Sequence, residues 1–541
     1  MSVQLELADI QGNILTAYGR LGFPKGRFLL LNVTDGRAGR KLLEMLRRTV
    51  TTALRWPSSK DEMVPGRVYQ SRPEVALNFA FTFRGLLALG VPIRTLRGMP
   101  DEFIDGMAAR ADILGDNYPR PITAMWDPVW HPTRDDAKRV HILVTLNAQM
   151  LPDGSAFPRM DELTREILAL CDLTKGGVRV LHGHAGEDTR WQDLSAILAP
   201  TDEGSMAPTP REHFGFVDAI GDPVFAGQHA PEKMAERVTG QGKLLPDQSW
   251  APLATGEFLL GHPDESQEIP AAGMPLDFSR NGTFFAYRKL HQNPRAFRDW
   301  VDESATQFAA VMGVGQEEAC ETLKAKMAGR WSDGVPLMAA GTYTEWKAFN
   351  AKRHAAARAE DRATLAALAR AMVDFTFRSD GQGAKCPLNS HLRRSNTRDM
   401  LDPYIGSDDP KRWNGSVLNN RRRILRRGLP YGGAMAENDD KGEHGIVMLA
   451  GCASLFRQFE FVQQQWMQYG LDFNSGNDTC PIIGNHDAES KFVISVDANS
   501  GKPPFICSRM PQFVETRGGE YFFVPSMTAL RMIATGLVDP T

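Results

Sequence analysis

The chain has few cysteines, and none of them forms a motif. Six cysteines are spread over 541 residues without a CxxC pair: Cys171, Cys320, Cys386, Cys452, Cys480 and Cys507. Such wide spacing argues against a disulfide framework and against a structural zinc site. We therefore expect free thiols in a reducing compartment, which indicates a cytoplasmic protein.

Long apolar runs and strong charge are also missing. No stretch approaches the roughly 18 consecutive apolar residues of a transmembrane helix, and segment 1–15 lacks the pattern of a signal peptide. Lys and Arg number 62 and Asp and Glu 65, for a net charge of -3. This balance argues neither for a general nucleic-acid binder nor for a polybasic membrane anchor. The Walker A, GxSxG and HExxH motifs are absent, so their chemistries have no support.

Apolar periodicity predicts an α+β fold. In the first third we expect four strands, at 26–33, 77–82, 140–146 and 178–181. Helices lie between them, one containing Leu42 and Leu46 and one over 161–170, and the resulting βαββαβ order is ferredoxin-like. The length exceeds that of a usual single core, and segment 199–210 is rich in Pro, Ser and Thr. We therefore divide the chain into domains 1–205 and 206–541.

The second part repeats the alternation. Strands are expected near 256–260, 283–290, 446–451 and 521–524. Helices are expected over 455–470 and within the Ala- and Arg-rich segment 345–375. The polar stretch 398–420 reads as a long loop, and loops of this length are often functional.

His391 is a candidate metal ligand. It lies in CPLNSHLRRSN (386–396), in a stretch otherwise free of histidine. A neutral imidazole is a good iron ligand, although a lone histidine more commonly binds a neighbouring carbonyl. Arg393, Arg394 and Arg398 follow closely, and their guanidinium groups suit a ligand that carries carboxylates.

Asp218 and Arg426 are candidates for proton transfer and charge stabilisation. Asp218 lies among apolar residues in FGFVDAIGDP (214–223), and a partly desolvated carboxylate can move a proton; the alternative is a turn aspartate that caps an amide. Arg426 lies in RRRILRRGLPYGG (421–433), which suggests a strand. Its cation would stabilise developing negative charge, unless it lies on a solvated face. Alternation places Arg427 on the opposite face.

Together these segments resemble the dye-decolorizing (DyP-type) family of haem peroxidases. The resemblance extends to four further segments: DIQGNIL (9–15), GRWSDGVPL (329–337), FEFVQ (459–463) and TRGGEYFF (516–523). It therefore spans nearly the whole chain. It implies two ferredoxin-like domains in a dimeric α/β-barrel-type arrangement, with haem b bound in the C-terminal domain.

The resemblance also assigns roles to single residues. By motif position, Asp218 is the distal acid, Arg426 the distal arginine and His391 the axial ligand of the iron. The other haem contacts are expected at Arg394, Arg398, Ile446 and Met448. We also expect a carboxylate behind the ring of His391, at a position that the sequence does not identify.

The implied function is a peroxidase that uses hydrogen peroxide to oxidise dyes, phenols and other aromatic reductants, with Mn(II) left open. No nucleic-acid or membrane partner is expected, and a homo-oligomer is left open. Two alternatives remain. A haem-handling protein with incidental peroxidase activity would need His391 but neither Asp218 nor Arg426, and a chlorite dismutase-like enzyme would not need Asp218.

The chain departs from the family pattern at two positions and in one loop. Ala219 ends the GxxDG pattern in place of glycine, and Met448 stands where a phenylalanine is expected. Loop 398–420 separates His391 from Arg426. Outside these segments, His182 and His184 form a His-Gly-His pair without a third ligand. Trp466, Tyr431 and Tyr521 could relay electrons, but core packing is the commoner role for such residues.

Overall fold

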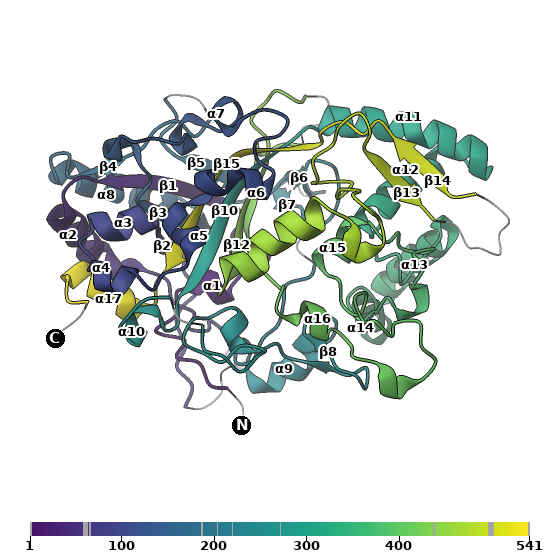
Figure 1. Cartoon of the computed structure of the whole chain (residues 1–541), viewed down its shortest axis with the longest axis horizontal. Coiled ribbons are helices and arrows are strands. Elements are labelled where there is room, and N and C mark those ends of the chain that lie inside the picture. The colour runs from purple at the N-terminus through teal and green to yellow at the C-terminus, as the bar shows by residue number, and fades with distance from the viewer. Residues whose placement is uncertain are drawn as a thin grey trace.

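An antiparallel sheet of nine strands lies at the centre of the molecule (Figure 1). The computed structural model describes residues 3–57, 63, 66–185, 188–202, 204–218, 220–270, 272–435, 439–495 and 503–538. The strand order is β11-β12-β10-β15-β2-β3-β1-β4, and β5 also pairs with β1. The strands are β1 (Lys25–Val33), β2 (Val75–Phe81), β3 (Ile142–Ala148), β4 (Val178–Val180), β5 (Gln192–Ser195), β10 (Thr283–Gln292), β11 (Leu425–Tyr431), β12 (Gly445–Cys452) and β15 (Val514–Val524).

The two halves of the sequence build adjacent halves of this sheet. Strands β1 to β5 come from the first half, and β10, β11, β12 and β15 come from the second. The halves meet where Phe523 of β15 pairs with Phe81 of β2. If β5 is set aside, each half has four strands in the same arrangement. The first strand lies between the third and the fourth, and the second strand lies on the far side of the third. Helices α2 (Gly36–Leu46) and α8 (Arg159–Leu173) connect strands of the first half.

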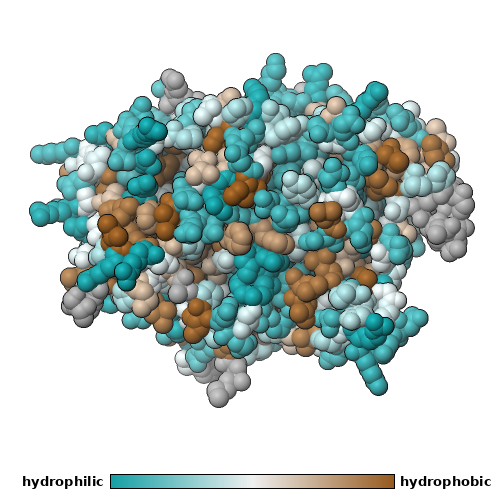
Figure 2. Space-filling view, in the orientation of Figure 1, coloured by the Kyte–Doolittle hydropathy of each residue, from teal (hydrophilic) through white to brown (hydrophobic). Residues whose placement is uncertain are grey.

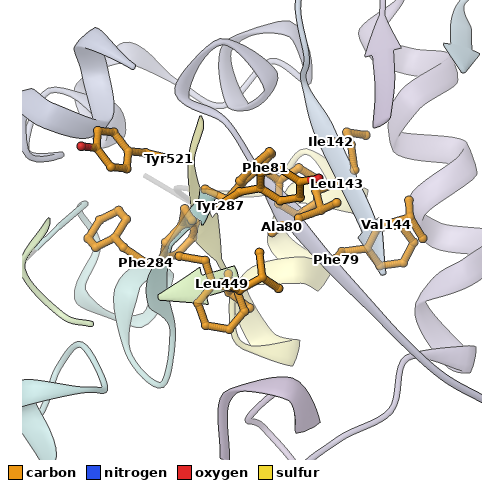
Figure 3. Close-up of a cluster of buried hydrophobic side chains, with 14 of the residues drawn as sticks. Phe79, Ala80, Phe81, Ile142, Leu143, Val144, Phe284, Tyr287, Leu449 and Tyr521 are labelled. Atoms are coloured by element: carbon orange, nitrogen blue, oxygen red, sulfur yellow. The ribbon is translucent and has the colours of Figure 1, made fainter. Parts of the chain in front are cut away.

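The sheet carries the larger apolar core. Every residue of β2 and of β3 is buried, as expected for strands covered on both faces. Figure 3 shows part of this core, with Phe79 and Phe81 from β2, Ile142 from β3, and Tyr287 from β10 close to one another. Burying such side chains contributes about 1.5–3 kcal/mol each. Because they come from both halves of the chain, the core holds the halves together.

A second core lies among helices inserted between β10 and β11. Four of these helices contribute to the core: α11 (Pro294–Met312), α12 (Gln316–Ala328), α13 (Tyr343–Arg358) and α15 (His391–Ser395). The same insertion also contains α14 (Arg362–Ala371) and α16 (Val417–Asn420). The hairpin of β13 (Lys491–Ile494) and β14 (Phe505–Ser508) packs into the same core. In Figure 1 α11 to α15 lie on the opposite side of the molecule from α2 and α8.

Most of the predicted strands are confirmed, and one is wrong. All four strands expected in the first third are present, as are those near 283–290, 446–451 and 521–524. Segment 256–260 is not a strand, because a 3-10 helix covers Thr255–Glu257 and a turn follows. Its apolar residues are buried in that turn, which gives the segment the composition of a buried strand.

Three other predicted segments differ in detail from the expectation. The helical segment 345–375 is divided into α13 and α14, and residues 455–467 form consecutive π-helical segments. The linker candidate 199–210 contains a hairpin of β6 (Leu198–Pro200) and β7 (Met206–Pro208). All six cysteines are free, as predicted.

The face shown in Figure 2 carries apolar residues in small separate groups among hydrophilic ones. Within the described part of the chain, no helix combines the length and the apolar character needed to cross a membrane.

Candidate active site

Asp218 and Arg426 are in contact. Their salt bridge measures 3.1 Å between Arg426 Nη1 and Asp218 Oδ1, across 208 positions of sequence. The negative charge of Asp218 raises the pKa of Arg426 above its usual value. The side chains of Arg426 and Asp218 remain 37% and 46% accessible. A small molecule can therefore reach a carboxylate and a guanidinium that already lie together.

Strands β11 and β12 present an open face beside this pair. Burial alternates along β11 and over the first part of β12. Gly428 pairs with Met448 and Pro430 with Ile446, and residues paired in an antiparallel ladder point to the same face. Arg426 shares this face by alternation. Ile446 and Met448 are partly accessible, so they lie where a group bound next to Arg426 would contact them.

The opposite face of β11 anchors the site to the rest of the protein. Arg427 donates to the carbonyls of Asn13 and Ile14, at 3.0 and 2.7 Å, and to Asp222 at 2.9 Å. Its predicted place on the other face is confirmed. Asp222 also accepts the backbone N–H of Arg426 at 3.2 Å. The loop that carries Asp218 is thus fixed to β11 next to Arg426.

His391 is the first residue of α15, and Ser390 is the N-cap. Its Nδ1 lies 3.3 Å from the Sγ of Cys480. Within the described ranges, no hydrogen bond involves its Nε2, which is the nitrogen left to bind a metal. The expected carboxylate behind the ring is wrong, because a cysteine sulfur occupies that position.

Cys480 has an altered acidity. Burial by itself raises the pKa of the thiol, but the charge and hydrogen bond of His391 outweigh burial. Arg394 acts in the same direction, and together these groups lower the pKa from 9.0 to about 7.

Arg394 has a different environment from the one expected. It is fully buried, and its guanidinium donates to the carbonyls of Trp466, Tyr469 and Asp478, each at 2.7 Å, and to that of Asn389 at 3.0 Å. These four bonds use four of the five N–H donors of the guanidinium. Arg394 therefore fixes α15 to the chain around residues 466–478, and its expected contact with the cofactor stays a prediction.

Arg398 is buried and forms no salt bridge with any residue that the structure describes, although Asp399 and Asp374 lie close enough to offset part of its charge. Its Nη1 donates to the Phe375 carbonyl at 2.6 Å, whereas its Nε has no partner in the described parts of the chain. Burial, together with repulsion from Arg330 and Arg423, lowers the pKa of Arg398 well below its usual value. Burying unpaired cations is costly, so this cluster favours an anionic ligand. Two propionates are what a haem would bring, and the residues here fit that group.

The segment 329–337 lies between the candidate residues. Its Ser332 carbonyl accepts the N–H of Val217, next to Asp218, at 3.0 Å. Its Gly329 packs so closely on α15 that an added Cβ would lie 2.5 Å from the Cβ of Leu392. The segment thus contacts the neighbours of both Asp218 and His391.

The loop that follows Asp218 also lies close to the end of α15. If Gly221 carried a Cβ, this atom would lie 3.6 Å from the side-chain amide nitrogen of Asn396, which follows α15 directly. The structure therefore brings the segments of Asp218, Arg426 and His391 into one region. Ala219, at which the sequence departs from the family pattern, lies outside the described residues.

Sequence reasoning missed Glu212. Its carboxylate accepts the N–H groups of Phe214 and Phe216, at 2.9 and 2.8 Å, and the side-chain amide of Gln292. Burial raises the pKa of Glu212 to about 7. These bonds shape the turn that leads to Asp218. Sequence reasoning also missed Cys480 and Asp222. Of these two, only Asp222 lies in a recognisable sequence pattern, the Gly-Asp-Pro turn at 221–223.

The remaining candidates are the His182–His184 pair and three aromatic residues, and none of them forms part of this site. No group of metal-binding side chains occurs at His182 and His184 or elsewhere in the described ranges. Trp466, Tyr431 and Tyr521 are buried in the two cores, at 2%, 1% and 0% exposure.

Comparison with known proteins connects this arrangement to one family. No protein-family model matches the chain. Peroxidase 2 of Mycetinis scorodonius is 26% identical over 98% of this chain and 88% of its own length. The multifunctional dye peroxidase DyP2 of Amycolatopsis sp. is 28% identical over 68% of this chain and 70% of its own length. The solved dye-decolorizing peroxidase of Auricularia auricula-judae has the same fold, with a TM-score of 0.67 over 98% of this chain and 100% of that one, at 23% identity.

These findings confirm the resemblance drawn from the sequence. The chain is a homologue of the peroxidases, a class of oxidoreductases that act on hydrogen peroxide. Within that class it is related over nearly its whole length to the dye-decolorizing peroxidases. Members of that family are haem enzymes, so a haem cofactor is implied.

Proposed function

We propose that the chain is a haem peroxidase with haem b held by His391 through Nε2. The observation that carries this proposal is the accessible pair of Asp218 and Arg426 on the open face of β11 and β12. In this proposal Arg398 binds a propionate, which would supply the negative charge that the buried guanidinium lacks. Ile446 and Met448 contact the cofactor from the same face.

We also propose the finer architecture that the resemblance implies: two ferredoxin-like domains, 1–205 and 206–541, arranged as in a dimeric α/β barrel. The identical strand order in the two halves supports it. The hairpin of β6 and β7 lies at the proposed boundary.

Each residue of the pair has its own chemical role. A bound haem would supply the redox chemistry that couples the reduction of hydrogen peroxide to the oxidation of a reductant. Asp218 accepts a proton from one peroxide oxygen and returns it to the departing oxygen, which leaves as water. Arg426 donates hydrogen bonds to the negative charge that develops on that oxygen. Because the two groups are 3.1 Å apart, both can act on one bound molecule.

The reductants in this proposal are dyes, phenols and other aromatic molecules, with Mn(II) as a further candidate. A cytoplasmic location agrees with six free cysteines. The haem-handling alternative is less favoured, because the related proteins are named as peroxidases over nearly the full chain. That alternative also gives no role to the contact between Asp218 and Arg426.

The test is an absorption spectrum of the haem-reconstituted protein before and after one equivalent of hydrogen peroxide. We expect a Soret band that shifts on peroxide addition in the wild type and is lost or strongly altered in His391→Ala. A wild-type Soret band that does not change on addition of peroxide would point to haem handling. A His391→Ala spectrum equal to that of the wild type would remove His391 as the ligand.

A further inference from the structure

We infer that Cys480 is a positioning residue for His391: its sulfur accepts a hydrogen bond from Nδ1–H and holds the ring so that Nε2 faces the cofactor. This inference rests on the proposed role of His391 as the axial ligand. The Nδ1–Sγ separation of 3.3 Å is short for a hydrogen bond to sulfur.

The direction of this hydrogen bond follows from the chemistry of the ring. A neutral imidazole carries one proton, and the nitrogen that binds a metal must offer its lone pair. If Nε2 binds the iron, the proton is on Nδ1, and Nδ1 is the donor. The sulfur of Cys480 is then the acceptor, and it selects the tautomer that leaves Nε2 free to bind.

The backbone keeps the sulfur in place. Cys480 is fully buried, and its N–H donates to the Met467 carbonyl at 2.7 Å. Its own carbonyl accepts the N–H of Gly484 at 2.9 Å and lies 3.0 Å from Nε2 of His486. With both backbone groups engaged, the Cα of Cys480 cannot move away from His391 without breaking several hydrogen bonds.

Arg394 fixes the other partner to the same part of the chain. It lies three residues after His391, and its guanidinium binds the carbonyls of Trp466, Tyr469 and Asp478. Helix α15 and the segment that leads to Cys480 therefore form one unit. The ring of His391 is held at Nδ1 by the sulfur, and its helix is held by Arg394.

The identity of the acceptor sets the electron donation of the ligand. While it carries its proton, the sulfur of Cys480 is a weak acceptor, whereas a carboxylate in the same place would pull the Nδ1 proton more strongly and make His391 a stronger donor. Cys480→Asp should therefore lower the iron reduction potential and raise the iron–histidine stretching frequency. Cys480→Ala leaves a buried N–H unpaired and should shift both quantities in the opposite direction.

The experiment compares haem-loaded wild type with Cys480→Ala, Cys480→Ser and Cys480→Asp. It measures the iron–histidine stretch of the ferrous protein by resonance Raman spectroscopy, and the reduction potential by spectroelectrochemistry. Cys507→Ala is the matched control, because Cys507 is a free, buried thiol in the same apolar core. We expect the stretching frequency to rise and the reduction potential to fall in the order Ala, Ser, Asp at position 480. The serine variant should lie nearest to wild type, and the control should be unchanged. Haem retention should fall by about 10–100-fold in Cys480→Ala.

Two results would overturn the inference, and they differ from each other. If His391→Ala loses the Soret band but every folded Cys480 variant has the stretch and the potential of Cys507→Ala, only the role of Cys480 fails. If His391→Ala keeps the wild-type spectrum, His391 is not the ligand and the proposed function fails as well. Should the aspartate variant not fold, the alanine and serine variants still decide between these results.

Discussion

The charge of the Asp218 carboxylate is required for the first proton transfer in the proposed chemistry. Asp218→Asn removes that charge and keeps the shape of the side chain, with one oxygen still available to Arg426. Positioned acid–base groups contribute about 10²–10⁴-fold to rate, which corresponds to about 3–5 kcal/mol at roughly 1.4 kcal/mol per factor of ten. We expect kcat/KM for hydrogen peroxide to fall by that factor.

The same substitution should hardly change stability. The salt bridge between Asp218 and Arg426 is partly exposed, at 46% and 37% accessibility. Exposed ion pairs contribute about 0–1 kcal/mol because water and salt screen them. Haem content and Tm should therefore stay close to wild type, so that a loss of rate reports on chemistry and not on folding.

Asp222→Asn provides the matched control four residues away. Asp222 binds Arg427, whose side chain is only 4% accessible, and breaking a buried pair costs about 3–5 kcal/mol. This variant should lose stability and keep most of its rate per haem-loaded molecule. Stopped-flow measurement of the Soret change against peroxide, together with thermal unfolding, distinguishes the two effects. A kcat/KM for Asp218→Asn within about threefold of wild type would refute the acid–base role, since that role implies at least about a hundredfold.

Two further predictions concern buried charge. Arg398→Met removes a buried guanidinium that forms no salt bridge in the described ranges. The Tm of the haem-free protein should therefore rise, while the affinity for haem falls. A lower Tm in the haem-free variant would contradict the interpretation that the buried cation is destabilising. Glu212 has a pKa of about 7 in the folded protein, above its ordinary 4.5. Folding therefore favours its protonated form, and its contribution to stability is greatest below pH 4.5 and is lost as the pH rises through 7. In urea unfolding, wild type should lose stability relative to Glu212→Gln over that interval, and a constant difference would count against the assignment.

The strands could be predicted because their apolar runs are long and buried on both faces. Strand β3 has seven buried residues in sequence, and few other structures need such a run. Segment 256–260 shows the limit of this reasoning. Phe258, Leu259 and Leu260 are fully buried, but in a turn, and burial selects apolar residues whatever the backbone hydrogen bonds.

The site could be predicted only as far as short motifs reach. Asp218, Arg426 and His391 each lie in a recognisable segment, whereas Cys480 is 89 residues from His391 and has no pattern around it. Arg394 and Arg398 look equivalent in the sequence. They differ because backbone carbonyls bind the first, whereas the second lies over an aromatic ring, among both cations and carboxylates, and forms no salt bridge with a described residue. Such differences depend on tertiary packing, which spacing along the chain does not encode.

The position of β15 has a consequence for synthesis on the ribosome. This strand is the last in chain order among those the structure describes, and it pairs with β10 and with β2 in the middle of the sheet. Until residues 514–524 have emerged, a nascent chain leaves one edge of β10 and one of β2 unpaired. Unpaired strand edges invite pairing with other chains. Emergence of β15 is therefore the step that closes the sheet, and a chain that stops upstream of 514 would leave two open edges in its centre.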